Sequence, residues 1–253
     1  MPQTNPTRAL VRPPGDSYPT ALTRLSPAPP IDLELAREQH TAYVSALREC
    51  GVDVIRLPPD PAHPDAVFVQ DPVLVVAGCA LASCSAAESR RGEADALLAV
   101  LEQYLPIAQL QPPATLDGGD VLLAEGQVYV GLSTRSNREA CLQLATVTSL
   151  PVEGVPLPAD LLHLLSGCTY LGRNRLLTLA ALAPMFESCE CIRVPEEEAA
   201  AANVLIVGEH AIVPAGYPHT AALVAQCGFK LHCVPISEFE KRDGGVTCLA
   251  LLF

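Results

Sequence analysis

Three residues far apart in the sequence have the side chains that nucleophilic catalysis by a cysteine requires: Cys248, His163 and Asp117. A cysteine thiolate attacks electrophilic carbon, and an imidazole can give a proton to a leaving amine and then activate water. A carboxylate can fix the tautomer of that imidazole. Spacing along the chain does not show that the three side chains meet, so the trio is a hypothesis that depends on the fold.

The local sequence sets each member of the trio apart only modestly. Cys248 follows two glycines at 244–245, which permit close backbone approach, and we expect it inside the last strand of the chain. His163 lies in an apolar run, where a buried core histidine is the plain alternative. Asp117 opens the segment Asp-Gly-Gly-Asp at 117–120, which can be an Asx turn and nothing more.

Motifs of other enzyme classes are missing from the sequence. It contains no Walker A loop, no His-Glu-x-x-His, no Gly-x-Ser-x-Gly and no Asp-x-His-x-Asp of the manganese ureohydrolases. The 10 cysteines include no Cys-x-x-Cys pair, so zinc knuckles and thioredoxin-like redox pairs are not indicated. We therefore predict no metal site and no cofactor.

Length, composition and charge limit the class of protein. The 253 residues are 49% hydrophobic and 17% charged, which excludes a disordered chain. The net charge of −12 argues against a nucleic-acid partner and suits a small cationic substrate. No apolar run approaches the roughly 18 residues that cross a bilayer, and residues 1–6 lack the regions of a signal peptide. We expect a cytoplasmic protein without a membrane partner.

Five segments of short apolar strands recur about 35 to 49 residues apart. Four have the pattern strand, turn, strand and begin at residues 71, 120, 168 and 203. The fifth ends the chain at 246–253 and is expected to pair with a strand at 9–12. Helices are expected between them, one capped by Asp32 and ending at Gly51, another from Ser89 to near Pro106. The repetition suggests a closed α/β propeller, with an open α/β sheet as the alternative.

A series of longer motifs runs in order over nearly the whole chain. It includes Glu38-Gln-His-Thr-Ala-Tyr, Asp65-Ala-Val-Phe-Val-Gln-Asp-Pro, Thr115-Leu-Asp-Gly-Gly-Asp, Leu162-His-Leu and Asp243-Gly-Gly-Val-Thr-Cys. In this order the motifs resemble those of the dimethylarginine dimethylaminohydrolase family, within the guanidino-modifying superfamily. The resemblance implies a single catalytic domain over 1–253, with a pentein-like, five-bladed α/β propeller of pseudo-repeated ββαβ units.

The resemblance also implies a role for each site residue. Cys248 is the nucleophile, His163 the general acid/base and Asp117 the carboxylate that holds His163. Arg90 and Arg135 would clamp the substrate α-carboxylate, a task that suits the guanidinium fork. The remaining implied contacts are Asp71 for the guanidinium, and Asp65 with the backbone carbonyls near Leu22 and Arg242 for the α-amino group.

One position departs from the family pattern. The family has a second carboxylate where this chain has Gln70, next to Asp71. The glutamine keeps a hydrogen-bond acceptor but removes a negative charge that would face the substrate cation. The loop at 83–87 also lacks the Arg-Pro-Gly common in the family. The preferred substituents on the guanidine are therefore left open.

The implied activity is hydrolysis of Nω-methylated L-arginines to L-citrulline and a methylamine, through a covalent thiouronium on Cys248. The implied partner is a small cationic amino acid, a homodimer is compatible with the sequence, and the family's setting is arginine metabolism and nitric oxide regulation. Two alternatives remain: the same chemistry on arginine or another substituted guanidine, and a catalytically silent binder of cationic amino acids. The presence of all three trio residues argues against the silent binder.

Overall fold

A computed structural model describes residues 6–253; residues 1–5, which entered the signal-peptide prediction, lie outside the described residues. The described residues form two compact units. The middle unit comprises Gln70–Ala202, and the terminal unit comprises residues 6–69 together with Asn203–Phe253. That residues 1–253 form a single catalytic domain stays a prediction.

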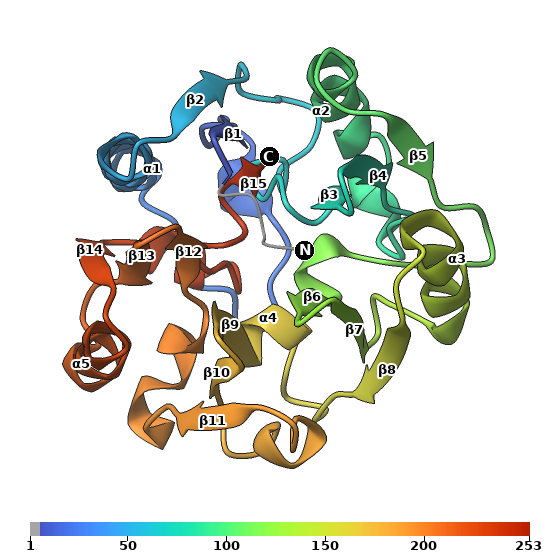
Figure 1. The fold of residues 1–253 in the computed structure, drawn as a ribbon. Coiled ribbons are helices and arrows are strands. Elements are labelled where there is room, and N and C mark those ends of the chain that lie inside the picture. Colours follow the sequence, from blue (N-terminus) through green and yellow to red (C-terminus); the bar gives the residue numbers. More distant parts are fainter. Residues whose placement is uncertain (1–5) are drawn as a thin grey trace. The chain divides into compact units, whose positions relative to one another are not determined.

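The described part of the middle unit contains three three-stranded sheets of one pattern (Figure 1). In each sheet two antiparallel strands form a hairpin, and the third strand runs parallel to the second. The strands are β3 (Val73–Val76), β4 (Cys79–Ala82), β5 (Ile107–Gln109), β6 (Val121–Ala124), β7 (Gln127–Leu132), β8 (Val152–Pro156), β9 (Cys168–Gly172), β10 (Arg175–Thr178) and β11 (Glu190–Arg193). The elements between the second and third strands are α2 (Glu93–Leu101), α3 (Arg138–Thr148) and the 3-10 helix Ala183–Met185.

The described part of the terminal unit contains two sheets of the same pattern, with strand orders β15-β1-β2 and β12-β13-β14. Their strands are β1 (Arg8–Val11), β2 (Asp53–Arg56), β12 (Leu205–Val207), β13 (His210–Pro214), β14 (Lys230–Val234) and β15 (Leu251–Leu252). The crossover helices are α1 (Leu33–Glu49) and α5 (Pro218–Gln226), and α6 (Ser237–Glu240) follows β14. The last strand pairs antiparallel with the first, with Ala9 opposite Leu252, as predicted.

The fold class predicted from the sequence is confirmed. Residues 6–253 contain five separate ββαβ sheets, which is the repeat of a five-bladed α/β propeller and not one open sheet. Turn chemistry explains why each hairpin closes so tightly. The two-residue loops at 77–78, 125–126 and 173–174 hold both residues at positive φ, the conformation of a type I′ turn whose twist matches the flanking strands.

Two local predictions were wrong. Cys248 does not lie inside the last strand: it lies in a turn, because its N–H bonds back to the carbonyl of Gly245 at 3.2 Å, and β15 begins three residues later. Ser89 does not open a long helix. It belongs to the short 3-10 helix Glu88–Arg90, and α2 begins at Glu93, after Gly92 at a φ of 100°.

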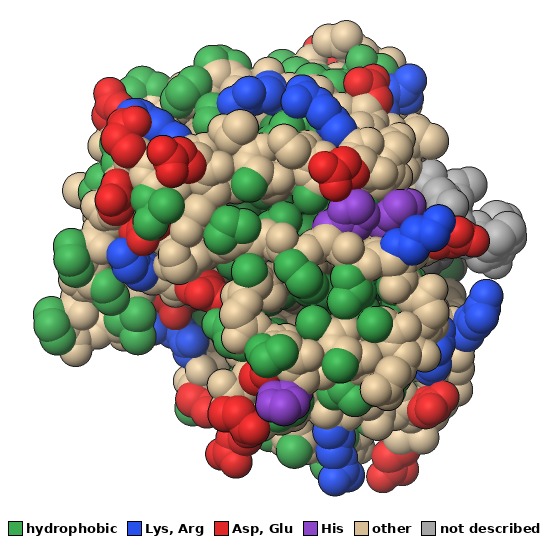
Figure 2. All heavy atoms as spheres, turned by 90° about the vertical axis from the view of Figure 1, so that its left-hand side faces the viewer, with side chains coloured by type: hydrophobic (Ala, Val, Ile, Leu, Met, Phe, Trp, Pro, Cys, Tyr) green, Lys and Arg blue, Asp and Glu red, His purple; other side chains and the backbone are tan. Residues whose placement is uncertain are grey.

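Each unit buries its own apolar side chains. The core of the terminal unit gathers residues of α1, β1, β12, β13 and the segment that contains Cys248. The middle unit has two cores, one around the sheet β6-β7-β8 on its α3 side and one around β9, β10 and α4 (Leu164–Gly167). Within residues 6–253 no helix is long and apolar enough to cross a membrane. On the face seen in Figure 2, acidic and basic side chains are interspersed.

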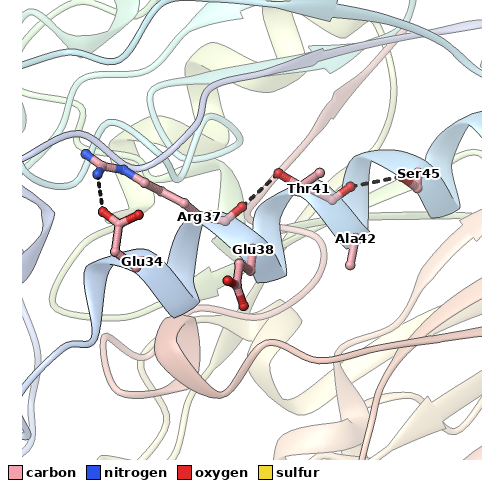
Figure 3. A pocket seen from close by; sticks show the side chains of 6 residues that line it. All are labelled: Glu34, Arg37, Glu38, Thr41, Ala42 and Ser45. Carbon is pink, nitrogen blue, oxygen red and sulfur yellow. Dashed lines mark hydrogen bonds and ion pairs between the residues drawn. The ribbon is translucent and has the colours of Figure 1, made fainter.

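The local sequence of α1 explains where this helix begins and which of its faces is buried. Asp32 is its N-cap, and the Asp32 side chain accepts a hydrogen bond from the N–H of Leu35 at 3.0 Å. The outward face forms a shallow hollow with an Arg37–Glu34 ion pair of 2.6 Å and side-chain-to-backbone bonds along the helix (Figure 3). The opposite face buries Tyr43, Val44 and Leu47 against the terminal-unit core.

The N-cap gives a stability prediction. Asp32→Ala removes the acceptor for the N–H of Leu35, and we expect the free energy of unfolding to fall by about 1 kcal/mol. Urea denaturation followed by circular dichroism measures the change. Asp32→Ser retains a capping oxygen and should cost only a few tenths of a kcal/mol, roughly. Equal losses in the two variants would contradict the capping role.

Candidate active site

The imidazole of His163 lies between two carboxylates of the middle unit. Its Nε2 is 3.3 Å from Oδ2 of Asp117, and its Nδ1 is 3.9 Å from Oδ1 of Asp71. All three side chains are buried. A carboxylate accepts hydrogen bonds and does not donate them, so an imidazole with one on each side is best matched when both ring nitrogens carry a proton. His163 is therefore no ordinary core histidine.

The side chain of Asp120 holds the backbone next to His163 in place. Its Oδ1 accepts the N–H of Leu164, the residue after His163, at 3.0 Å. Its Oδ2 accepts the hydroxyls of Ser133 at 2.7 Å and Ser136 at 2.6 Å. Three hydrogen bonds satisfy this fully buried carboxyl and hold the first turn of α4 against the loop after β7.

Gly118 and Gly119, which lie between Asp117 and Asp120, let the backbone pass close to its neighbours. A Cβ on Gly119 would lie 2.7 Å from Nδ1 of His163 and 2.9 Å from Oδ1 of Asp71. A Cβ on Gly118 would lie 2.0 Å from the carbonyl oxygen of Gln70. A Cβ at any of these three distances would clash with its neighbour. In addition, the N–H of Gly119 donates a hydrogen bond to Asp71 at 3.1 Å. The motif at 117–120 is therefore more than an Asx turn.

Arginines neutralise both carboxylates that face His163. Nη1 of Arg90 bonds Oδ2 of Asp71 at 2.7 Å, while its Nε and Nη2 bond the carboxylate of Glu93 at 3.0 and 2.8 Å. Nη1 of Arg135 lies 3.4 Å from Oδ2 of Asp117. The buried charges thus form alternating pairs, which is the condition for keeping them in the interior.

These contacts move the pKa values of the cluster in opposite directions. Burial alone would lower the pKa of His163, but the charges of Asp71, Asp117 and Asp120 outweigh it and raise that pKa above its ordinary value. Burial alone would raise the pKa of Asp71, but His163 and Arg90 outweigh it and lower that pKa. Both shifts favour a protonated His163 next to an ionised Asp71, which is the protonation state that a general acid needs.

Asp71, Asp117 and His163 could in principle hold a cation, since one ligand atom of each lies within 4.8 Å of the others. The charges argue against it. Arg90 and Arg135 already compensate the two carboxylates, so a dication would add positive charge beside two guanidinium groups. The set fits an imidazolium better than a metal ion.

The terminal unit holds Cys248 in a turn that is anchored by a side chain. The amide of Asn203 accepts the N–H of Thr247 at 3.0 Å and donates to the hydroxyl of Thr247 at 2.8 Å. The N–H of Gly245 donates to the sulfur of Cys248 at 3.4 Å. A Cβ on Gly245 would lie 2.3 Å from Oδ1 of Asn203, and one on Gly244 would meet the buried ring of Phe68 at the same distance. The glycine pair is required by packing, as the sequence suggested.

The residues expected to hold the α-amino group also belong to the terminal unit. Both carboxylate oxygens of buried Asp65 accept the N–H of Leu22, at 3.1 and 3.4 Å. Arg242 donates to the carbonyls of Pro19 at 2.7 Å and Pro29 at 3.0 Å. These bonds tie down the segment before α1 and bring Leu22 directly to Asp65.

Gln70 is the departure from the family pattern. The oxygen of its side-chain amide, Oε1, is buried without a hydrogen-bond partner among the described residues. An unsatisfied buried acceptor costs free energy unless a ligand or water meets it. Gln70 immediately precedes Asp71, so this acceptor belongs to the same stretch of chain as the charge cluster.

The sequence reasoning missed four residues that position the others. Asp120 and Glu93 complete the charge network, and Ser136 and Asn203 anchor loops. The signals were present in part: Asp120 closes the Asp-Gly-Gly-Asp motif, and Glu93 follows Arg90 at the i,i+3 spacing of a helix-type ion pair. Nothing in the spacing indicated Asn203, which lies 44 residues from its partner.

Comparison with known proteins agrees with this fold. The model of the family "N,N dimethylarginine dimethylhydrolase, eukaryotic" matches residues 28–152. The chain is 39% identical over 228 residues to the N(G),N(G)-dimethylarginine dimethylaminohydrolase of Pseudomonas aeruginosa, covering 88% of this chain and 90% of that protein.

Two solved structures are similar over almost the full length. A cysteine-to-serine variant of the dimethylarginine dimethylaminohydrolase from Pseudomonas aeruginosa, in complex with citrulline, is 36% identical with a TM-score of 0.94, covering 99% of this chain and 100% of that one. The second is a histidine-to-glycine variant of a dimethylarginine dimethylaminohydrolase, as an adduct with S-methyl-L-thiocitrulline. It is 37% identical with a TM-score of 0.93, and the match covers 98% of this chain and 100% of that one.

The repeated ββαβ sheets and these full-length matches define a pentein-type α/β fold of enzymes that act on guanidino groups. The chain belongs to the dimethylarginine dimethylaminohydrolase family.

The charge cluster gives a prediction about His163. Its ring should titrate above the ordinary value of about 6.5, because the neighbouring carboxylates favour the imidazolium. Since the pKa is higher in the folded than in the unfolded chain, protonation stabilises the fold fully below about pH 6.5, and this contribution is lost as the pH rises through the folded pKa. Asp71→Asn removes the largest favourable charge and should lower the pKa.

The pKa of His163 can be followed by NMR of the imidazole carbons during a pH titration. Glu102→Gln, which removes an exposed carboxylate after α2, is the matched control and should leave the titration unchanged. A His163 pKa that is the same in Asp71→Asn and in the wild type would contradict the coupling.

Proposed function

We propose that this chain hydrolyses Nω-methylated L-arginines to L-citrulline and dimethylamine or methylamine, through a covalent intermediate on Cys248. The observation that carries the proposal is the buried imidazole of His163, held beside Asp117 and Asp71 with its pKa raised, in a chain of this family. The two similar structures support it: one holds citrulline in a protein with its cysteine replaced, the other an adduct in a protein with its histidine replaced.

The proposed reaction has two steps. The thiolate of Cys248 attacks the guanidinium carbon, and the departing amine takes the proton from His163 as its C–N bond breaks, which leaves a thiouronium on sulfur. Neutral His163 then accepts a proton from water as the water oxygen bonds to the same carbon. The C–S bond breaks, which regenerates the thiolate of Cys248, and citrulline leaves after giving its extra proton to solvent, where the free amine takes one up. A buried histidine whose pKa is raised by neighbouring carboxylates suits the first step.

Asp117 is proposed to orient and charge-stabilise the imidazole, because it is the carboxylate within hydrogen-bond distance of Nε2 of His163. Asp71 is proposed to bind the substrate guanidinium, and its lowered pKa keeps it ionised for that contact. Both roles use the negative charge of carboxylates that each also contact one arginine of the cluster.

Arg90 and Arg135 are proposed to receive the substrate α-carboxylate. Arg135 is joined to Asp117 by a single 3.4 Å contact, which leaves most of its donors for a ligand. Arg90 bonds Asp71 and Glu93 through three nitrogens, so its contribution is in large part to position Asp71. Its direct part in the clamp stays a prediction.

The α-amino group is proposed to bind Asp65 and the backbone carbonyls of Leu22 and Arg242. Support comes from the terminal unit, where Asp65 is buried, acidic and bonded directly to the Leu22 backbone. A carboxylate and backbone carbonyls are acceptors, which is what an ammonium group with three donors requires.

A second candidate substrate is arginine or a differently substituted guanidine. The observation that favours it is Gln70, whose buried carbonyl oxygen has no partner where the family pattern places a carboxylate. A neutral acceptor binds a guanidinium less strongly than a charged one does. A catalytically silent binder is disfavoured, because binding alone does not require a proton stored on His163.

The setting of the enzyme is proposed from its composition. A net charge of −12 suits a free cationic amino acid as ligand and disfavours nucleic acid. We propose a cytoplasmic location without a membrane partner. A homodimer and a link to nitric oxide regulation stay predictions.

Replacing the nucleophile tests the proposal directly. Cys248→Ser should fold normally but lose at least about a thousandfold in turnover, because a serine hydroxyl is a far weaker nucleophile without an adjacent base. Citrulline formation from asymmetric dimethylarginine, monomethylarginine and arginine measures the loss, and mass spectrometry of wild-type protein quenched during turnover should show one adduct on Cys248. Cys227→Ser, at the end of α5, is the control and should keep full activity. Activity retained in Cys248→Ser would end the covalent mechanism.

Restoring the missing charge tests the substrate. Gln70→Glu should lower KM for methylated arginines several-fold if these are the natural substrates, because charge-assisted hydrogen bonds are roughly twice as strong as neutral ones. If Gln70 adapts the site to another guanidine, the change should improve asymmetric dimethylarginine and harm that other compound. The measurement is kcat/KM over a panel of substituted guanidines, with Gln103→Glu in the exposed turn after α2 as control. Indifference of every substrate would show that Gln70 does not face the guanidinium.

A further inference from the structure

A second group of ligand-type side chains lies in the terminal unit, among residues to which the proposed reaction gives no role. Cys50, His210 and His232 each place one donor atom within 4.8 Å of the other two. They come from three elements: Cys50 caps the C-terminus of α1, His210 begins β13, and His232 lies in β14. All three are partly exposed, so the cluster is accessible from solvent.

The two imidazoles point their ring nitrogens at each other. Nδ1 of His210 lies 2.9 Å from Nε2 of His232, and the ring centroids are 5.1 Å apart. The other nitrogen of His232, Nδ1, is 3.1 Å from Oε2 of Glu49. Because a carboxylate accepts hydrogen bonds, Nδ1 of His232 carries the hydrogen and Nε2 presents its lone pair. His210 then donates from Nδ1 across the short contact.

We propose that Cys50, His210 and His232 form a binding site for a divalent transition-metal ion of borderline softness, for which Zn²⁺ is the probe. One thiolate and two imidazoles make up a donor set that Zn²⁺ uses, with a fourth position left for water or another ligand. Calcium and magnesium, which prefer oxygen ligands, should not compete.

Glu49 strengthens the case, because it supplies the outer contact that metal-binding histidines usually have. A histidine ligand generally donates its second ring N–H to a carboxylate or carbonyl, which fixes the tautomer and raises its basicity. His232 already makes this bond in the structure. The ring is therefore oriented with Nε2 toward the other two donors before any ion arrives.

The proton changes on binding are small and balance. A cysteine ligates a metal ion as its thiolate. On binding, the sulfur loses one proton to solvent and forms the bond to the metal. His210 moves its hydrogen from Nδ1 to Nε2 without a change of charge, and the lone pairs of both rings then face the ion.

Occupation of the site would cross-link the end of α1 to β13 and β14. Since the three donors are brought together only by folding, an ion bound there stabilises the folded form of the terminal unit, and the stabilisation grows with the logarithm of the free ion concentration above Kd. The site is separate from Cys248 and His163 in its residues, so its existence does not depend on the proposed hydrolysis.

Cobalt and zinc titrations of the metal-free, full-length protein test the proposal. Co²⁺ should give the sulfur-to-cobalt charge-transfer band and the strong visible bands of a tetrahedral site, and Zn²⁺ should bleach them at one equivalent. Cys50→Ser should remove the charge-transfer band and weaken Zn²⁺ binding at least about tenfold. Glu49→Gln, which leaves the three ligands in place, should weaken it by roughly 10- to 100-fold.

Matched variants separate this site from other thiols and imidazoles. Cys227→Ser and His219→Gln, on α5 outside the cluster, should leave the cobalt spectrum intact, as should Cys248→Ser. The melting temperature without metal reports whether each variant folds; if His210→Gln or His232→Gln does not fold, Cys50→Ser and Glu49→Gln decide. A cobalt–sulfur band that survives in Cys50→Ser and disappears in Cys248→Ser would overturn the proposal. So would the absence of zinc-dependent stabilisation in the wild type, which would leave a plain hydrogen-bonded histidine pair.

Discussion

The middle unit is organised around one buried interaction, the imidazole of His163 between the carboxylates of Asp71 and Asp117. Charges removed from water are tolerated only when each is paired and hydrogen-bonded. The surrounding structure meets that demand: Arg90 and Arg135 compensate the carboxylates, and a glycine pair lets the chain approach within contact of the ring. The same pairing that makes the cluster tolerable raises the pKa of His163, so the interactions that stabilise the cluster also favour the protonated form that the proposed reaction uses.

Two thiols of the terminal unit, Cys248 and Cys50, have different surroundings. Cys248 sits in a turn held by Asn203, with a backbone N–H directed at its sulfur. Cys50 lies beside Glu49, whose charge adds to burial in keeping the thiol protonated, and it faces two imidazoles. The first environment fits the proposed attack on an organic electrophile, while the second fits the proposed binding of a metal ion.

Much of the fold could be predicted because its signals are local. Short apolar strands separated by two-residue turns recur along the sequence, and each turn admits the positive φ that a tight hairpin needs. Asp32 is a helix-capping residue at the start of α1. The last strand pairs with the first, as its apolar pattern suggested. The third strand of each sheet was harder to predict, because three to five residues with mixed burial carry little periodicity.

The sequence by itself determined the residue types of the trio, the repeat and the glycine pairs, because these follow from composition, period and the steric freedom of glycine. Tertiary structure decided the rest. It placed Cys248 in a turn and not a strand, because a hydrogen bond back to Gly245 outweighs the β propensity of the segment. It also gathered Cys50, His210 and His232, which no motif links. Contacts across 160 residues or more depend on how helices and sheets pack, and spacing along the chain does not encode that packing.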